Sequence, residues 1–241
     1  MIIDALDAAP NYVPSTDWPF DLAPVRQLLD DGLTFNADVT FLVGENGSGK
    51  STIVEAIAEA YGADVRGGHT GRRYDNRPEK GPLGNALLLR FNPAATAMIR
   101  RPKGFFLRAE TAYGVFEFMS DHNVPGYGDE HLLHISHGES FLQIFGAQFD
   151  NPGLYLLDEP EAALSFSSCL ALMAVLQEVT ERGGQVICAT HSPLLASLPG
   201  ADIFELTPGG IDRSAWDDLA LVQNWKAYLA NPASYLRHLL D

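Results

Sequence analysis

One stretch of the sequence has the residue types and spacing of a phosphate-binding loop. The pattern G-x-x-x-x-G-K-[ST] is matched by Gly44, Glu45, Asn46, Gly47, Ser48, Gly49, Lys50 and Ser51. In such a loop, glycines let backbone N–H groups converge on phosphate oxygens, and the following helix points its positive end at them. Lys50 would reach the β- and γ-phosphates, Ser51 would supply a hydroxyl to Mg²⁺, and Thr52 would lie near the α-phosphate. An apolar run before the loop and an amphipathic pattern after it distinguish it from a chance glycine-rich turn.

A second candidate for chemistry is a pair of carboxylates, Asp158 and Glu159, directly after the apolar run Leu154–Leu157. Ending a buried strand in two charges is costly unless they face a cation or a polar site. Asp158 could hold Mg²⁺, commonly through water, and Glu159 could orient and deprotonate an attacking water. Phosphoryl transfer needs mainly positioning and charge neutralisation, which these groups and a lysine can provide. The alternative is a solvated strand end.

The composition is that of an ordinary globular protein, with 241 residues of which 46% are hydrophobic and 20% charged. This length suits one large α/β domain with a substantial core, or at most two small domains. No apolar run approaches the roughly 18–20 residues that span a bilayer, and the first residues lack the features of a secretory signal. Cys169 and Cys188 lie in apolar patterns and are expected to be buried thiols in a reducing cytosol. We therefore expect a cytoplasmic protein.

Charge is unevenly distributed along the chain. The net charge of −15 opposes non-specific binding to nucleic acid. Between Gly62 and Glu110, however, lie ten of the 16 basic residues and only four of the 31 acidic ones, so this segment carries +6. Its cations could contact nucleic acid, pair with the acidic remainder of the protein, or reach a bound nucleotide. A protein partner is the alternative to nucleic acid.

Short apolar runs alternate with helical patterns, which favours a mainly parallel sheet flanked by helices, with an antiparallel flank. Strands are expected at Val39–Val43, Ala86–Phe91, Phe105–Ala109, Leu154–Leu157, Val186–Ala189 and Ile203–Leu206. Helices are expected at Ser51–Tyr61, Gly138–Phe149, Ala162–Arg182, Leu219–Ala230 and Pro232–Leu240. We expect one domain over residues 1–241, with a strand-and-loop flank (1–38), a nucleotide-binding core (39–206) and a helical tail (207–241).

Two further sequence motifs indicate which class of P-loop ATPase the chain resembles. Ile135–Ser140 (ISHGES) precedes a helical pattern and lies where ATPases of the ABC class carry the signature LSGGQ. Ala189–Pro193 (ATHSP) follows the next strand and resembles their switch-histidine loop. In order and spacing, the four motifs resemble ABC-class P-loop ATPases from Val39 to about Leu206. The run Asp158–Glu161 (DEPE) most resembles stand-alone heads related to chromosome-maintenance, recombination-repair and overcoming-lysogenization-defect proteins, and the whole chain resembles small bacterial "predicted ATPases" of that group.

The resemblance implies the P-loop NTPase fold, ATP and Mg²⁺ as cofactors, and hydrolysis with Glu159, His191 and Lys50 as catalytic residues. It also implies a homodimer that holds two ATP molecules head to tail. Ser136 and Gly138 of one subunit would contact the γ-phosphate bound by the other, while His191 would contact it from its own subunit. The sequence departs from the family where His137 replaces the first glycine of the signature. No glutamine lies between Ser51 and Gly138 to form the metal-sensing Q-loop, and Glu110 is the best substitute.

The sequence leaves three candidate functions. An ATP-driven dimerising switch of non-transporter type is favoured by the DEPE run and the missing Q-loop glutamine. The alternative is the energy-coupling ATPase subunit of a membrane transporter. A nuclease or kinase is disfavoured because only about 50 residues follow His191. The histidines at 131, 134 and 137 lack supporting zinc ligands. Trp216, Trp225 and Tyr228 are expected to pack helices, and Trp18 or Phe20 could stack on adenine.

Overall fold

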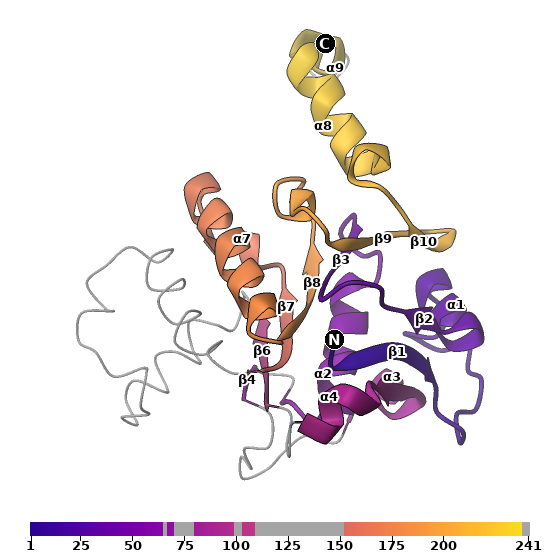
Figure 1. Ribbon diagram of the computed structural model, residues 1–241. Coiled ribbons are helices and arrows are strands. Elements are labelled where there is room, and N and C mark those ends of the chain that lie inside the picture. Colours follow the sequence, from indigo (N-terminus) through magenta and orange to yellow (C-terminus); the bar gives the residue numbers. More distant parts are fainter. Residues whose placement is uncertain (65–66, 70–79, 99–102, 109–151, 238–241) are drawn as a thin grey trace, which may run out of the picture.

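The computed structural model describes residues 1–64, 67–69, 80–98, 103–108 and 152–237 of the 241-residue chain. Its main feature is a seven-stranded sheet with the order β10-β9-β3-β8-β7-β6-β4 (Figure 1). The strands are β3 (Val39–Gly44), β4 (Gly68–His69), β6 (Lys103–Arg108), β7 (Gly153–Asp158), β8 (Gln185–Thr190), β9 (Asp202–Thr207) and β10 (Gly210–Arg213). Strands β9, β3, β8, β7 and β6 are parallel, and β10 and β4 pair antiparallel at the two edges.

Three inner strands end side by side at one edge of this sheet. Val43 of β3 pairs with Thr190 of β8, and Asp158 of β7 pairs with Ala189 of β8. The segments that follow these strands therefore emerge at neighbouring positions on the carboxyl edge, which is where open α/β sheets bind ligands. The expected phosphate-binding loop, carboxylate pair and switch-histidine loop all begin there.

A smaller antiparallel sheet contains the chain's first strands. Its order is β2-β1-β5, made of β1 (Ile3–Ala8), β2 (Leu33–Thr34) and β5 (Leu87–Phe91). The expected antiparallel flank is thus confirmed. The expectation that residues 1–38 hold only strand and loop was wrong, because they also contain helix α1 (Ala23–Asp31). This helix buries Val25, Leu28 and Leu29 and ends at Gly32, whose φ of 73° suits glycine.

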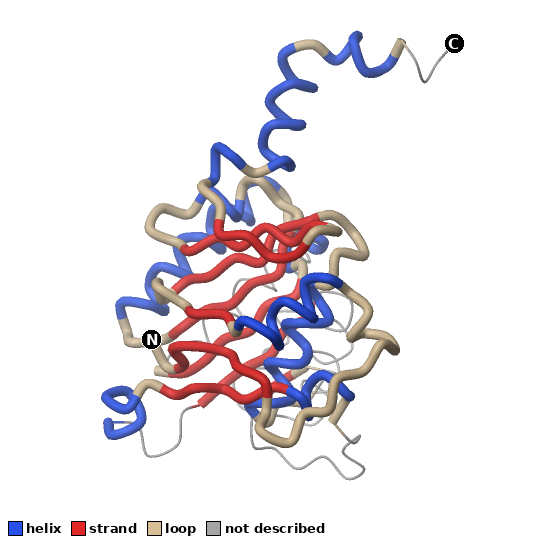
Figure 2. Tube along the Cα trace, turned by 90° about the vertical axis from the view of Figure 1, so that its right-hand side faces the viewer, coloured by secondary structure: helices blue, strands red, loops and turns tan. Residues whose placement is uncertain are grey.

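Helices cover both faces of the larger sheet (Figure 2). Successive residues of a strand point to opposite faces, so Leu42 packs in one core with helix α2 (Lys50–Tyr61) and the smaller sheet. Its neighbour Phe41 packs in a second core with helix α7 (Phe166–Glu181). Because both faces of the inner strands are buried, their sequences are continuous apolar runs. The short helices α3 (Pro82–Ala86) and α4 (Pro93–Met98), which the sequence pattern did not predict, flank β5 in the chain.

Helix α7 begins later than the sequence pattern predicts. Pro160–Ala163 forms a 3₁₀ turn, η2, and Leu164 is extended. Ser165 then caps α7, because its side chain accepts a hydrogen bond from the backbone N–H of Ser168. The expected helix start at Ala162 was therefore wrong by four residues. The expected helix Gly138–Phe149 lies outside the described residues.

After β10, the C-terminal tail extends away from the sheet (Figure 1). The 3₁₀ turn η3 (Leu195–Ser197) precedes β9, and the tail consists of the 3₁₀ turn η4 (Trp216–Asp218), α8 (Ala220–Ala230) and α9 (Pro232–Leu236), of which α8 lies close to its expected bounds. The expectation of a helical tail from residue 207 was wrong at its start, because strand β10 lies in that range. The expected end of the last helix at Leu240 lies outside the described residues. Within the described ranges, no helix combines the length and the apolar character needed to cross a membrane.

Candidate functional site

The turn between β3 and α2 depends on its glycines. Gly47 and Gly49 have φ values of 83° and 95°, in the left-handed region that glycine tolerates best. Gly44 is needed for a different reason, since a Cβ there would lie 2.5 Å from the carbonyl oxygen of Leu206 and 2.7 Å from Ser48 Oγ. The path of the loop therefore depends on Gly44 and Gly49, which the phosphate-binding pattern requires, and also on Gly47, at a position that the pattern leaves open.

Lys50, the first residue of α2, has a side chain only 2% exposed. Its Nζ donates a hydrogen bond to the carbonyl oxygen of Glu45 at 2.9 Å and lies 3.7 Å from Glu159 Oε1. An ammonium group has three donors, and within the described part of the chain one of them has a hydrogen-bond acceptor. Phosphate oxygens would satisfy the remaining donors of this buried cation, so the cradle fits a nucleotide phosphate.

Ser51 and Thr52 lie in the first turn of α2, at its positive end. Asp158 ends β7 and is 3% exposed. A hydroxyl and a carboxylate oxygen are the kinds of ligand that Mg²⁺ prefers. Ser51, at the start of α2, and Asp158, at the end of β7, therefore offer the oxygen ligands that a Mg²⁺ ion would need.

Glu159 has an unusual backbone conformation. Its φ of 48° and ψ of 50° make it the non-glycine residue with positive φ in the described ranges. Such a conformation costs on the order of 1–3 kcal/mol and persists where the surroundings enforce it. Here the backbone N–H of Glu159 donates to the carbonyl oxygen of Ala189 at 2.9 Å. The chain turns sharply after Asp158, and the Glu159 carboxylate comes within 4 Å of both Lys50 Nζ and His191 Nδ1.

His191 directly follows β8, and two carboxylates face its ring. Nδ1 lies 3.6 Å from Glu159 Oε1 and 3.3 Å from Glu161 Oε1. Glu161, in η2, also accepts hydrogen bonds from Thr190 Oγ1 at 2.6 Å and from the backbone N–H of His191 at 2.7 Å. The structure thus brings together the three expected catalytic residues, and it adds Glu161 and Thr190, to which the sequence had assigned no role.

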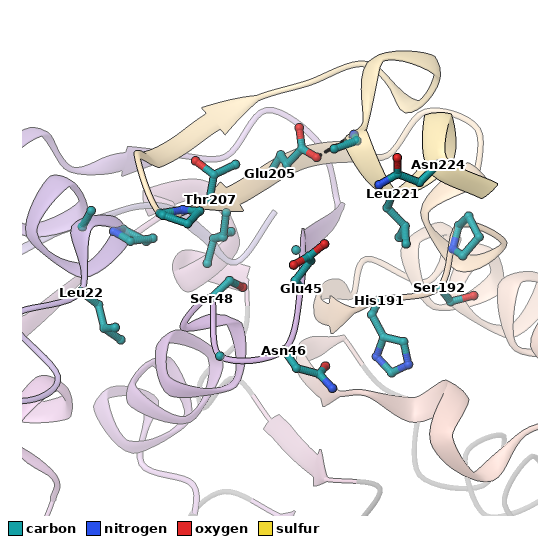
Figure 3. A pocket seen from close by; sticks show the side chains of 18 of the residues that line it. Leu22, Glu45, Asn46, Ser48, His191, Ser192, Glu205, Thr207, Leu221 and Asn224 are labelled. Carbon is teal, nitrogen blue, oxygen red and sulfur yellow. Dashed lines mark hydrogen bonds between the residues drawn. The ribbon is translucent and has the colours of Figure 1, made fainter. Parts of the chain in front are cut away.

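A pocket of about 1140 Å³ opens beside the loop. In Figure 3, Glu205 and Thr207 lie along one side, and Asn46 and His191 lie along the other. Trp225 of α8 also lines the pocket, whereas Trp18 is 67% exposed and is absent from the lining residues. Phe20 is buried against Tyr12, with 5.6 Å between ring centroids. Trp225, which was expected to pack helices, therefore lines the pocket, whereas Trp18 and Phe20, the candidates for stacking on adenine, do not.

Several expected site residues lie outside the described part of the chain. They are Glu110, Ser136, His137 and Gly138, with the histidines at 131 and 134. Six of the ten basic residues between Gly62 and Glu110 also lie outside it. Of the others, Arg90 pairs with Asp7 at 2.7 Å and Arg108 pairs with Glu55 at 2.7 Å. Pairing with acidic residues, one of the alternatives for this segment, therefore holds for these two.

The two cysteines are buried, as expected, with exposures of 4% for Cys169 and 0% for Cys188. Burial raises the pKa of the Cys188 thiol well above its usual value, and the carboxylates of Glu161 and Asp158 raise it further. Burial likewise raises the pKa of Cys169. Both side chains are therefore neutral thiols that pack in the second core beside α7.

Comparisons with known proteins identify similar sequences and a similar fold. The hemin import ATP-binding protein HmuV of Rhizobium johnstonii is 28% identical over 179 residues, covering 67% of this chain and 68% of that protein. The vitamin B12 import ATP-binding protein BtuD of Photobacterium profundum is 24% identical over 258 residues, covering 99% and 96%. A crystal structure of a nucleotide-free ATP-binding cassette from an ABC transporter superposes with a TM-score of 0.50 at 16% identity, covering 96% of each chain. The expected fold class is confirmed.

Family models match the chain directly. Residues 25–85 match a model described as "AAA domain". Residues 74–197, more than half of the 241, match a model described as "AAA domain, putative AbiEii toxin, Type IV TA system". The chain belongs to this AAA-domain family, and it is a P-loop ATPase nucleotide-binding domain of the ABC/AAA type.

Proposed function

We propose that this chain is a cytoplasmic ATPase that binds Mg-ATP at Gly44–Thr52 and hydrolyses it to ADP and phosphate. One observation carries the proposal: the Glu159 carboxylate lies 3.7 Å from Lys50 Nζ and 3.6 Å from His191 Nδ1. The end of the phosphate-binding loop therefore lies beside three groups that the reaction needs. These are the base Glu159, the cation Lys50 for the β- and γ-phosphates, and the imidazole of His191. Phosphoryl transfer depends mainly on such positioning and charge neutralisation.

Each residue has a proposed task. Lys50 binds the β- and γ-phosphate oxygens, and backbone N–H groups of the loop bind the phosphates around it. Ser51 and Asp158 hold the metal, with Glu110 as a further candidate, and bound Mg²⁺ would neutralise phosphate charge. Glu159 orients the attacking water and takes its proton, while His191 contacts the γ-phosphate from its own subunit.

We further propose that ATP closes two copies into a head-to-tail dimer and that hydrolysis reopens it. Ser136 and Gly138 would contact the γ-phosphate bound by the other subunit. The chain would act as one ATPase domain, with residues 39–206 as its nucleotide-binding core. The DEPE run and the lack of a glutamine between Ser51 and Gly138 support a non-transporter role. The switch would act on a protein or a nucleic acid.

The energy-coupling subunit of a transporter is the alternative, because the relatives HmuV and BtuD are import ATP-binding proteins by name. Purification of the Glu159→Gln protein from its native host separates the two functions. If the chain is a switch, we expect a homodimer that forms with Mg-ATP and without another protein. The transporter subunit predicts stoichiometric co-purification with an integral membrane protein.

Phosphate release by the purified protein tests hydrolysis directly. We expect Mg-ATP-dependent release from the parent, and at least about 10²-fold less from Glu159→Gln, which loses the base but keeps the metal site. Equal release by both proteins would contradict the assignment of Glu159. A parent protein that binds ATP without releasing phosphate would contradict the proposed activity.

A further inference from the structure

Glu161 joins the segment after β7 to the loop after β8. Its side chain is 8% exposed, although it belongs to a 3₁₀ turn near the surface. One oxygen, Oε1, accepts from Thr190 Oγ1 at 2.6 Å and from the backbone N–H of His191 at 2.7 Å. The same oxygen lies 3.3 Å from His191 Nδ1. A single oxygen of this largely buried side chain therefore contacts the switch-histidine residue at both its backbone and its ring.

Further hydrogen bonds involve the residues on both sides of Glu161. Thr190 Oγ1, which donates to Glu161, also accepts from the backbone N–H of Ser192 at 3.0 Å. On the other side, the backbone N–H of Ala162 donates to the carbonyl oxygen of Glu159 at 3.0 Å and closes η2. Hydrogen bonds to a charged acceptor are stronger than neutral ones, especially in a buried setting. Glu161 therefore connects η2 directly to the loop that carries His191.

The carboxylate is placed to favour one of the two ring nitrogens of His191 as the site of the proton. When an oxygen acceptor faces one nitrogen of a neutral imidazole, the proton resides on that nitrogen. Glu161 and Glu159 both face Nδ1, at 3.3 and 3.6 Å. Nε2 is then the nitrogen left for a bound nucleotide or its attacking water.

We propose that Glu161 is a positioning residue for ATP hydrolysis, which holds the backbone of His191 and fixes its ring with Nδ1 protonated and Nε2 free. The inference rests on the proposed function, because it gives His191 its orientation toward the nucleotide. Glu161 acts through His191 and does not itself contact the phosphates. Nucleotide binding by Lys50 and the loop does not involve this contact.

Steady-state kinetics with two variants of Glu161 test the role in turnover. Glu161→Met keeps the length of the side chain and removes the acceptor, and we expect kcat to fall about 10- to 100-fold. The affinity for ATP should stay within about 2-fold of the parent, since Lys50 and the loop are unchanged. Glu161→Gln retains an acceptor oxygen and should recover most of kcat. Glu178→Met, at an exposed glutamate of α7 that pairs with Arg182, is the matched control and should behave as the parent.

Three outcomes of these kinetics would overturn the inference. Parent-like kcat in Glu161→Met would show that the acceptor is not needed. A loss of ATP affinity as large as the loss of kcat would show that Glu161 maintains the whole site and does not act through His191. A correctly folded Glu161→Gln protein that is as slow as Glu161→Met would also contradict the role of the acceptor.

Nitrogen NMR of the histidine rings gives a readout without nucleotide or turnover. In ¹⁵N-histidine-labelled protein, the resonances of His191 are assigned by their loss in His191→Asn. We expect neutral His191 to carry its proton on Nδ1 in the parent and in Glu161→Gln, and to shift toward the Nε2–H form in Glu161→Met. An Nε2–H ring in the parent would overturn the inference. A parent that shows the Nδ1–H ring but no phosphate release would refute the proposed hydrolysis and leave the positioning contact standing.

Discussion

Arg108 of β6 lies in register with Asp158 of β7, and its Nε is 3.6 Å from Asp158 Oδ2. The same guanidinium binds Glu55 of α2, with Nη1 2.7 Å from Oε1. Arg108 therefore contacts both α2, the helix after the phosphate-binding loop, and β7, the strand before Glu159. The Asp158 side chain is only 4% exposed, so the electrostatic surroundings of that carboxylate are set largely by its protein neighbours.

We predict that Arg108→Met destabilises the protein by about 1–3 kcal/mol, because the buried carboxylate of Asp158 loses a nearby cation. Urea unfolding measures the loss. Mg-ATP should restore more stability to this variant than to the parent if a metal ion at Asp158 replaces the missing charge. Arg182→Met, which removes an exposed i,i+4 pair with Glu178, should change stability by less than about 0.5 kcal/mol. Equal losses in the two variants would contradict the buried role of Arg108.

Gln185 links the two sheets and gives a second test of stability. Its Oε1 accepts from the backbone N–H groups of Ile2 and Ile3 at 2.7 and 2.8 Å, and its Nε2 donates to the carbonyl oxygen of Ile3 at 2.9 Å. Gln185→Leu leaves these buried groups without partners and should cost about 3 kcal/mol in urea unfolding. Gln177→Leu, at an exposed position of α7, is the control. A loss below about 1 kcal/mol would show that water replaces the lost bonds.

The strands and the helix around the phosphate-binding loop could be predicted because their local pattern and their burial agree. Phe41 and Leu42 pack in opposite cores, so the apolar run of β3 has no interruption. Helix α1 was missed because its apolar face, Val25, Leu28 and Leu29, spans only two turns in a segment rich in proline. Such a short helix depends on packing against the sheets more than on its own pattern.

The roles of Glu161 and Arg108 could not be predicted for a different reason. Glu161 reaches His191 because the chain turns through the left-handed conformation at Glu159, and no local sequence pattern specifies that turn. Arg108 meets Asp158 because β6 pairs with β7, although 44 residues of chain separate β6 from β7. Contacts that depend on the order of strands in a sheet are not encoded by spacing along the chain. The DEPE run was informative about the family, and it carried no information about what its last residue touches.

Lys50→Ala should abolish tight ATP binding. The substitution removes the cation that faces the β- and γ-phosphates, and a charge-assisted contact to phosphate has no substitute in the loop. Titration calorimetry of the two proteins with ATP and Mg²⁺ measures the change, and thermal unfolding checks that the variant is folded. Lys80→Ala, at an exposed lysine, should bind like the parent. Equal affinity in Lys50→Ala and the parent would refute the assignment of the cradle.

Glu159→Gln should bind ATP as the parent does and remain in the ATP-bound state. The amide cannot take the proton of the attacking water, whereas Asp158 and Ser51 still offer their oxygens to the metal. Filter binding with radiolabelled ATP, followed over time, should show nucleotide retained as ATP by the variant and converted to ADP by the parent. Conversion at the parent's rate would mean that another group acts as the base.

The head-to-tail arrangement makes a prediction that separates binding from assembly. Glu159→Gln should become a dimer with Mg-ATP and remain a monomer without it, because separation would follow hydrolysis. Adding Ser136→Arg should prevent this dimer and leave the ATP affinity of the monomer unchanged, since Ser136 would act only across the interface. Light scattering gives the mass of each protein with and without Mg-ATP, and calorimetry gives the affinity. A monomer under all conditions would contradict the sandwich. A dimer that survives Ser136→Arg would place the interface elsewhere, and weaker ATP binding by that variant would mean that residue 136 serves the nucleotide of its own subunit.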